Sequence, residues 1–387
     1  MVTGDAPMPQ ATRGHIAWLG AGGALAVAAI PFLVQGRWLV GLGTLGLTLL
    51  SLAWYLVPGR KLAFALGAVA LSTTGTLVSV AGLDLYMHHR YARGGGYNIW
   101  GYRGDALARK QHGERRVEML GGSVTFGYGV SSDETIPAYL QAALNRGAAD
   151  RHAPPTAVAN LGWNSEGAYS FQYTLKDYEY LHSDVVIFYS GYNDLGMNTQ
   201  IFRHESAVFR LTGYLPMLPI IPLTNWLRRD TLGTTNQGKV IFTPRLSDQY
   251  ATEAADAALR ISQALERQLG RLVPGEIGSA RKGPQPETWQ YYLQTLRAAI
   301  TVALAQGKHV LVVTEPWISD THVEQQEAVA EMMGTEYGKD PRVRYRNAGL
   351  MIDLHDRAMC WDGMHLTAAG NKFVAEWLAP DVEEILR

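Results

Sequence analysis

The chain has 387 residues, enough to bury a sizeable core and to hold more than one domain. Its 34 lysines and arginines against 35 aspartates and glutamates give a formal net charge of -1, which provides no global basis for binding nucleic acid. The single cysteine, Cys360, excludes an intrachain disulfide and every zinc site that is built from several cysteines.

Three long apolar runs without a charged residue lie in the first 83 residues, at 16–34, 38–57 and 62–83. Each is close to the roughly 20 residues that a helix needs to cross a bilayer. Three such runs in succession, separated only by "QGR" and "PGRK", are neither a signal peptide nor ordinary core helices. The sequence therefore predicts a multi-pass membrane anchor of three transmembrane helices in residues 1–83.

Three spans would place the amino terminus and the bulk of the chain on opposite sides of the membrane. The basic residues beside the spans number three on each side: Arg13, Arg60 and Lys61 against Arg37, Arg90 and Arg93. This balance barely decides the orientation, and large domains cross membranes largely regardless of charge. Discounting the last two arginines for that reason, we expect an inside amino terminus and an extracytoplasmic large domain.

The chain after the anchor alternates between two patterns. Residues 84–105 are basic and glycine-rich and are predicted to be a juxtamembrane linker. From 106 to 387, short, continuously apolar runs, typical of strands buried on both faces of a parallel sheet, alternate with amphipathic stretches. The predicted strands are 117–121, 156–161, 184–190, 309–315 and 349–354. The predicted helices are 133–147, 166–182, 248–270, 287–306, 322–334 and 367–386.

This alternation predicts an α/β fold with a five-stranded parallel sheet and right-handed crossovers. An insertion at about 196–285 interrupts it. Within the insertion, the apolar segment "GYLPMLPIIPLTNWLRR" (213–229) contains three prolines that exclude a regular helix. Two interpretations of this segment stay open: a lid that contacts the membrane interface, or a loop that packs on the domain's own core.

Residues able to do chemistry follow several of the predicted strands. Ser123 follows the first strand, Gly162 the second and Asn193 the third, while Asp362 and His365 come after the last. Ligands of parallel α/β sheets bind outside the carboxyl ends of the strands, so we expect these residues to lie at one edge of the sheet.

This set of residue types suits acyl transfer. A serine is a poor nucleophile unless a neighbouring base takes its proton, which His365 can do. Asp362 can accept a hydrogen bond from the other imidazole nitrogen and fix the orientation of the ring. The negative charge that develops on the carbonyl oxygen needs donors already in place. The candidate oxyanion donors are the amides of Ser123 and Gly162 and the side chain of Asn193.

The motifs "GGSVTFG", "GYND" and "DGMHL", with Gly162 between the first two, resemble those of the SGNH/GDSL hydrolase family. The resemblance covers about residues 115–195 and 305–380. It implies a flavodoxin-like three-layer sandwich and assigns these roles: Ser123 as nucleophile, Gly162 and Asn193 as oxyanion donors, and Asp362 and His365 as the other triad members. The family's common motif has an aspartate where this chain has Gly122.

The sequence therefore predicts a membrane-anchored serine esterase or acyl hydrolase that acts on an acyl ester of a glycan or lipid through an acyl-enzyme. An O-acetyltransferase for an envelope or exported polysaccharide uses the same triad and stays open. A non-catalytic carbohydrate-binding or assembly subunit is the third alternative, against which the complete set of site residues argues.

No metal, cofactor or nucleic acid is expected. His88, His89 and His182 have no metal-ligand partners at useful spacing. Cys360 is predicted to be a small buried side chain, because no second histidine is placed to activate it.

Overall fold

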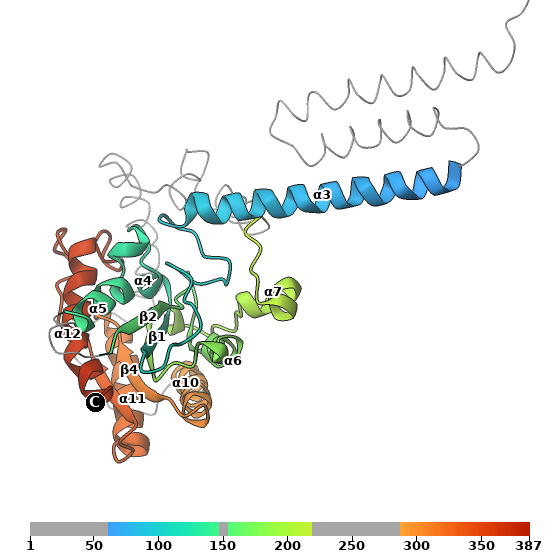
Figure 1. The fold of residues 1–387 in the computed structure, drawn as a ribbon. Coiled ribbons are helices and arrows are strands. Elements are labelled where there is room, and N and C mark those ends of the chain that lie inside the picture. Colours follow the sequence, from blue (N-terminus) through green and yellow to red (C-terminus); the bar gives the residue numbers. More distant parts are fainter. Residues whose placement is uncertain (1–60, 147–153, 219–286) are drawn as a thin grey trace, which may run out of the picture. The chain divides into compact units, whose positions relative to one another are not determined.

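The computed structural model describes residues 61–146, 154–218 and 287–387 (Figure 1). The chain divides into two compact units, Met1–Tyr86 and Met87–Arg387. The first two apolar runs and most of the segment 213–229 lie outside the described residues. The third run lies within helix α3 (Lys61–Tyr91), and its portion Gly67–Tyr91 is long and apolar enough to cross a membrane. It is the only such helix in the described part of the chain.

The second unit contains a five-stranded parallel sheet, which confirms the predicted α/β class. Its strands are β1 (Arg115–Gly121), β2 (Thr156–Asn160), β3 (Val185–Ser190), β4 (His309–Thr314) and β5 (Val343–Asn347). They are arranged in the order β2-β1-β3-β4-β5, and every neighbouring pair is parallel. This is the flavodoxin-like order, whose switch point lies where β1 and β3 separate the two directions of winding.

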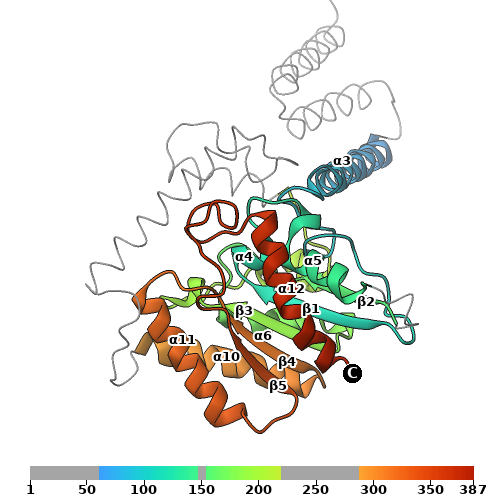
Figure 2. The same cartoon turned by 90° about the vertical axis from the view of Figure 1, so that its left-hand side faces the viewer.

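Helices cover both faces of the sheet (Figure 2). Helices α5 (Ile136–Leu144) and α12 (Ala368–Ile385) share one core cluster with the side chains on one face. Helices α6 (Ala168–Asp177), α10 (Glu287–Ala305) and α11 (Asp320–Met332) share another with the opposite face. Because side chains alternate along a strand, β1 sends Met119 to the first cluster and Leu120 to the second.

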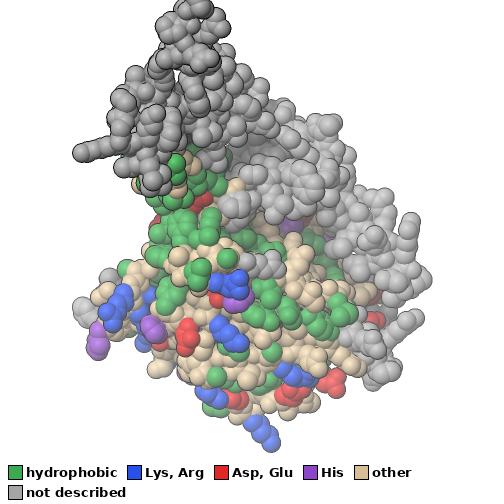
Figure 3. Space-filling model, turned by 90° about the vertical axis from the view of Figure 1, so that its right-hand side faces the viewer, with side chains coloured by type: hydrophobic (Ala, Val, Ile, Leu, Met, Phe, Trp, Pro, Cys, Tyr) green, Lys and Arg blue, Asp and Glu red, His purple; other side chains and the backbone are tan. Residues whose placement is uncertain are grey.

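Several short elements connect these helices and strands. They are α4 (Ser123–Phe126), α7 (Ala207–Thr212), the 3-10 turns Ser132–Glu134, Glu179–Leu181, Tyr192–Asp194 and Arg203–Glu205, and the π turn Met333–Tyr337. Helix α7 carries the exposed apolar side chains Val208 and Leu211. Figure 3 shows one face of the molecule, on which apolar side chains cover a broad area and charged side chains gather toward one end.

The predicted position of the fifth strand, 349–354, is wrong. The strand is Val343–Asn347, at the edge of the sheet, and most of it is only half buried. Two of its side chains, Arg344 and Arg346, pair with carboxylates of α12, so the strand lacks the continuous apolar pattern of a buried one. The apolar run 349–354 is a loop whose Ile352 and Leu354 fill the core beside α12.

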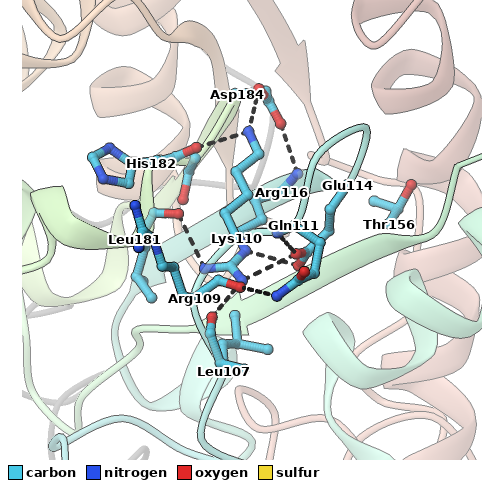
Figure 4. A network of polar contacts seen from close by, with 12 residues as sticks. Leu107, Arg109, Lys110, Gln111, Glu114, Arg116, Thr156, Leu181, His182 and Asp184 are labelled. Carbon is cyan, nitrogen blue, oxygen red and sulfur yellow. Dashed lines mark hydrogen bonds and ion pairs between the residues drawn. The ribbon is translucent and has the colours of Figure 1, made fainter.

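A polar network fixes the end of the sheet opposite the candidate site (Figure 4). Asp184, just before β3, accepts hydrogen bonds from Lys110 Nζ at 2.6 Å and from the backbone amide of Arg116 at 2.7 Å. The buried Arg116 guanidinium donates to Glu114 at 2.8 Å and to the carbonyl of Leu181 at 3.2 Å. These bonds tie the start of β1 to the start of β3 and so hold the register of the two strands that lead to Ser123 and Asn193.

Residues 87–104, from the stretch predicted to be a linker, belong to the second unit. Tyr97, Tyr102 and Arg103 are almost fully buried there. Arg103 also forms a bridge with Asn160 at the end of β2. This stretch, here called the connector, is therefore part of the packed core that surrounds the sheet.

Candidate active site

The structure brings Ser123, His365 and Asp362 into one chain of hydrogen bonds. Ser123 is the first residue of α4, directly after β1, and its Oγ lies 2.8 Å from His365 Nε2. His365 Nδ1 lies 2.8 Å from Asp362 Oδ2. With the Nδ1–H tautomer, the imidazole donates to the carboxylate and accepts from the serine hydroxyl. This is the geometry that a nucleophile, its base and the residue that orients the base require.

Asp362 is held as a carboxylate. Its side chain is almost fully buried, which opposes ionisation, but hydrogen bonds outweigh the burial and lower its pKa. The bonds come from the His365 ring and from the backbone amides of Met364 and His365, both of which donate to Oδ1. A carboxylate with one oxygen fixed by two amides presents the other oxygen to the imidazole in a single direction. The ring of Tyr128 lies 4.8 Å from the His365 ring and confines it further.

Close packing, not unusual backbone torsion, requires the two glycines before Ser123. Gly122 has a φ of −80°, which any residue can adopt. A Cβ on Gly122 would lie 2.0 Å from Asn193 Nδ2, however, and a Cβ on Gly121 would lie 2.3 Å from the carbonyl oxygen of Tyr189. A side chain larger than that of glycine at position 122 would therefore displace the Asn193 amide.

Asn193 lies directly against Gly122, in the 3-10 turn Tyr192–Asp194 that follows β3. Its Nδ2 donates one hydrogen bond to the carbonyl oxygen of Glu166 at 3.1 Å. A side-chain amide has two hydrogens, so one is left that a substrate oxygen could accept. The fixed hydrogen bond orients the amide before any substrate arrives, which is what electrostatic stabilisation of an oxyanion needs.

Gly162 lies beside α4, but its amide already has an acceptor within the chain. The Gly162 N–H donates to Asn160 Oδ1 at 3.1 Å, and Asn160 Nδ2 donates to the carbonyl of Thr125 at 3.0 Å. A Cβ on Gly162 would lie 2.5 Å from the backbone nitrogen of Phe126. A substrate oxygen would have to share this amide with Asn160. Nothing in the sequence distinguishes Asn160, because an asparagine at the end of a strand has no distinctive pattern.

Two buried carboxyl groups support the turn that carries Asn193. Glu315 Oε2 accepts from the amide of Tyr192 at 2.7 Å, and Asp194 Oδ1 accepts from the amide of Ala168 at 2.9 Å. Burial raises the pKa of Glu315 to about 8 and that of Asp194 to about 7. The preceding Gly191 has a φ of +153°, and a Cβ there would lie 2.7 Å from His322 Nε2. Glu315 thus holds the turn that carries Asn193.

His88 and Cys360 are both buried. In the described ranges, no group of three or more histidine, cysteine, aspartate or glutamate side chains could hold a metal ion. His88 is buried, with its two ring nitrogens 2.8 Å and 3.0 Å from the carbonyl oxygens of Tyr97 and Leu215. Cys360 is buried, and burial raises its pKa to about 11, so it is a neutral thiol at ordinary pH.

No protein-family model matches this sequence, and no curated protein matches it. Among solved structures, a family 3 carbohydrate esterase from Clostridium thermocellum is 12% identical over 70% of this chain and 98% of its own, with a TM-score of 0.35. A family two carbohydrate esterase from the same organism, in complex with cellohexaose, is 13% identical over 73% of this chain and 67% of its own, with a TM-score of 0.34. A lipase/acylhydrolase from Enterococcus faecalis is 12% identical over 70% of this chain and 96% of its own, with a TM-score of 0.33. Likenesses this distant do not indicate what the chain acts on.

Proposed function

We propose that this chain is a serine esterase or acyl hydrolase of the SGNH/GDSL type. The observation that carries the proposal is the hydrogen-bonded series from Ser123 through His365 to Asp362, at the carboxyl edge of a parallel sheet. The base within 2.8 Å of the hydroxyl and the oriented carboxylate behind it are what an activated serine needs. The nearby Asn193 amide adds a donor for the charge that acyl transfer creates.

In the proposed reaction, Ser123 Oγ attacks the carbonyl carbon of an ester while His365 Nε2 takes the hydroxyl proton. Asp362 stabilises the imidazolium that forms, and Asn193 donates to the oxyanion of the tetrahedral intermediate. The imidazolium then protonates the leaving alcohol, and the acyl group stays on Ser123. A water molecule, deprotonated by His365, then attacks the acyl-enzyme. The bond to Ser123 Oγ breaks, the imidazolium returns the proton to that oxygen, and the carboxylic acid is released.

We further propose that the substrate is an acyl ester of a glycan or lipid close to a membrane. Supporting this are the resemblance of the motifs and the three apolar runs in residues 1–83, the last of which lies in α3. The proposed arrangement is a multi-pass anchor with the catalytic unit on the extracytoplasmic side. Protein fusions at Arg37 and at the carboxyl terminus should then report the same side of the membrane, and a fusion at Arg60 the opposite side.

The direct test is labelling of the full-length chain, in membranes or detergent, by a fluorophosphonate probe. Such a probe reacts with an activated serine whatever the natural substrate is. The wild-type chain should be labelled, whereas Ser123→Ala, which removes the attacking oxygen, should not. Labelling that persists in Ser123→Ala would place the reactive serine elsewhere, and a wild-type chain that resists the probe would contradict the proposal.

A further inference from the structure

Arg103, a buried arginine of the connector, donates hydrogen bonds to the end of α4, the helix that begins at Ser123. Arg103 is 3% exposed, and each of its four acceptors is a backbone carbonyl oxygen. One terminal nitrogen donates to Phe126 at 2.5 Å and to Gly127 at 2.6 Å. The other donates to Gly94 at 2.6 Å and to Val130. Three of these carbonyls therefore belong to the end of α4 and the turn that follows it.

This arrangement is physically specific to arginine. The last carbonyls of a helix have no partner within the helix, and a cation is favoured at that end. A planar guanidinium offers donors on two nitrogens in a fixed fork, whereas an ammonium is a single point. Burial lowers the pKa of Arg103 to about 10, so the group still carries its charge at neutral pH. A buried charge is costly unless it is hydrogen-bonded. A movement of these carbonyls away from Arg103 would therefore cost free energy, and this cost holds them in place.

Arg103 also contacts the end of β2. Its backbone amide donates to the carbonyl oxygen of Asn160 at 3.1 Å. The side chain of Asn160 accepts from Gly162 N and donates to the carbonyl of Thr125, a residue of α4. Arg103 is thus hydrogen-bonded both to the end of α4 and to the end of β2, where the Asn160 side chain positions Gly162.

An apolar cluster joins the same parts. The ring of Tyr97 stacks on Trp163 with the centroids 4.0 Å apart, and it lies 5.3 Å from the ring of Phe126. Met217 completes the buried cluster, and Met87 and Tyr91, at the end of α3, pack against it. Ser123 is only one turn of helix before Phe126, so a shift of the connector would be transmitted to the nucleophile through side chains that are closely packed.

We propose that Arg103 is a positioning residue for Ser123, which makes the connector a working part of the active site. This proposal rests on the proposed function, because it assumes that Ser123 is the nucleophile. Arg103 does not touch the reacting atoms; it acts by fixing the carbonyls of Phe126 and Gly127 and thereby the direction of the Ser123 hydroxyl toward His365. A displacement of the connector would then change the position of Ser123.

The test uses the full-length chain in detergent with a small chromogenic acetyl ester and the fluorophosphonate probe. Misplacement of a reacting group by about 1 Å can cost about 10²-fold in rate. Arg103→Ala should therefore lower kcat and the labelling rate by about 10²-fold, with KM nearly unchanged. Guanidinium ion at a concentration that does not denature should restore part of the rate, and ammonium at the same ionic strength should not. The matched control is Arg93→Ala, in the same connector, because Arg93 pairs with Asp133 on the surface.

The outcomes separate the two proposals. A wild-type chain that is not labelled contradicts the proposed function itself. A labelled wild-type chain with an equally reactive Arg103→Ala overturns the role of Arg103 alone. Should Arg103→Ala fail to fold, Arg103→Lys decides, since it keeps the charge and loses the fork: we expect a cooperative melting transition and a lowered kcat. A lowered melting temperature with an unchanged kcat would show that Arg103 only stabilises the fold.

Discussion

Gly122→Ala should disable the proposed oxyanion donor and leave the proposed triad in place. The added methyl carbon would lie 2.0 Å from Asn193 Nδ2, whereas real Cβ atoms essentially never approach a neighbour within 3.0 Å. The amide must therefore move by at least 1.0 Å, the difference between the two distances. The backbone of Gly122, with a φ of −80°, can accept an alanine, so the crowding at Asn193 is the main effect.

A displacement of this size takes the Asn193 amide out of hydrogen-bond range of a developing oxyanion. Loss of one such donor costs about 10²–10³-fold in kcat, or roughly 2.7–4 kcal/mol. KM should change little, since the contact strengthens only as charge develops on the carbonyl oxygen. Overpacking in a buried site costs about 1–3 kcal/mol of folding stability, so the variant should still fold with a lowered melting temperature.

The assay is a double-mutant cycle on kcat with Gly122→Ala, Asn193→Ala and the pair together. Because the first change acts through Asn193, the double variant should be no slower than the slower single variant. The triad should stay reactive, so the fluorophosphonate probe should still label Ser123 in all three. Fully multiplicative losses would show that Gly122 acts by another route, and an unchanged kcat in Gly122→Ala would show that Asn193 is not the donor.

Three further predictions concern the base, a buried acid and the connector. His365→Ala and Asp362→Asn should each lower ester turnover by about 10⁴-fold, and turnover close to the wild-type value in either would contradict the triad. Burial raises the pKa of Glu315 from 4.5 to about 8, so the native chain keeps a proton that the unfolded chain loses, and stability falls as pH rises through that window. The melting temperature of Glu315→Gln should therefore rise relative to that of the wild type as the pH is raised from 4.5 to 8. A difference between the two melting temperatures that does not change with pH would mean that Glu315 is ionised in the folded chain. A chain lacking residues 1–83 should fold and react with the fluorophosphonate probe, whereas one lacking residues 1–104 should not react, and equal labelling of the two would exclude a role for the connector.

The sequence alone indicates the class of fold and the chemistry-bearing residues. Continuous apolar runs predict four of the five strands, because a strand buried on both faces leaves a pattern within its own few residues. The residues after those strands then fall at one edge of the sheet by topology, which is why Ser123 and Asn193 could be selected together. Their catalytic roles, and those of Asp362 and His365, stay predictions until a reaction is measured.

Strand β5 shows where local patterns fail. An edge strand has a single neighbour, so Arg344 and Arg346 can alternate along it and pair with α12. The apolar run that imitates a strand, at 349–354, is a loop that fills the core beside α12. Which of two adjacent segments joins the sheet depends on partners far away in the chain, which no local pattern records.

The contacts that define the site are decided by the tertiary structure. Ser123 and His365 are separated by 242 positions, and only the packing of the fold places their reacting atoms 2.8 Å apart. The sequence marks Gly162 as a donor, and only the structure shows that Asn160 already accepts from it. Arg103 lies in a basic, glycine-rich stretch that by itself predicts an exposed linker. Its burial against the carbonyls of α4 depends on how distant segments pack together, and composition contains no information about that packing.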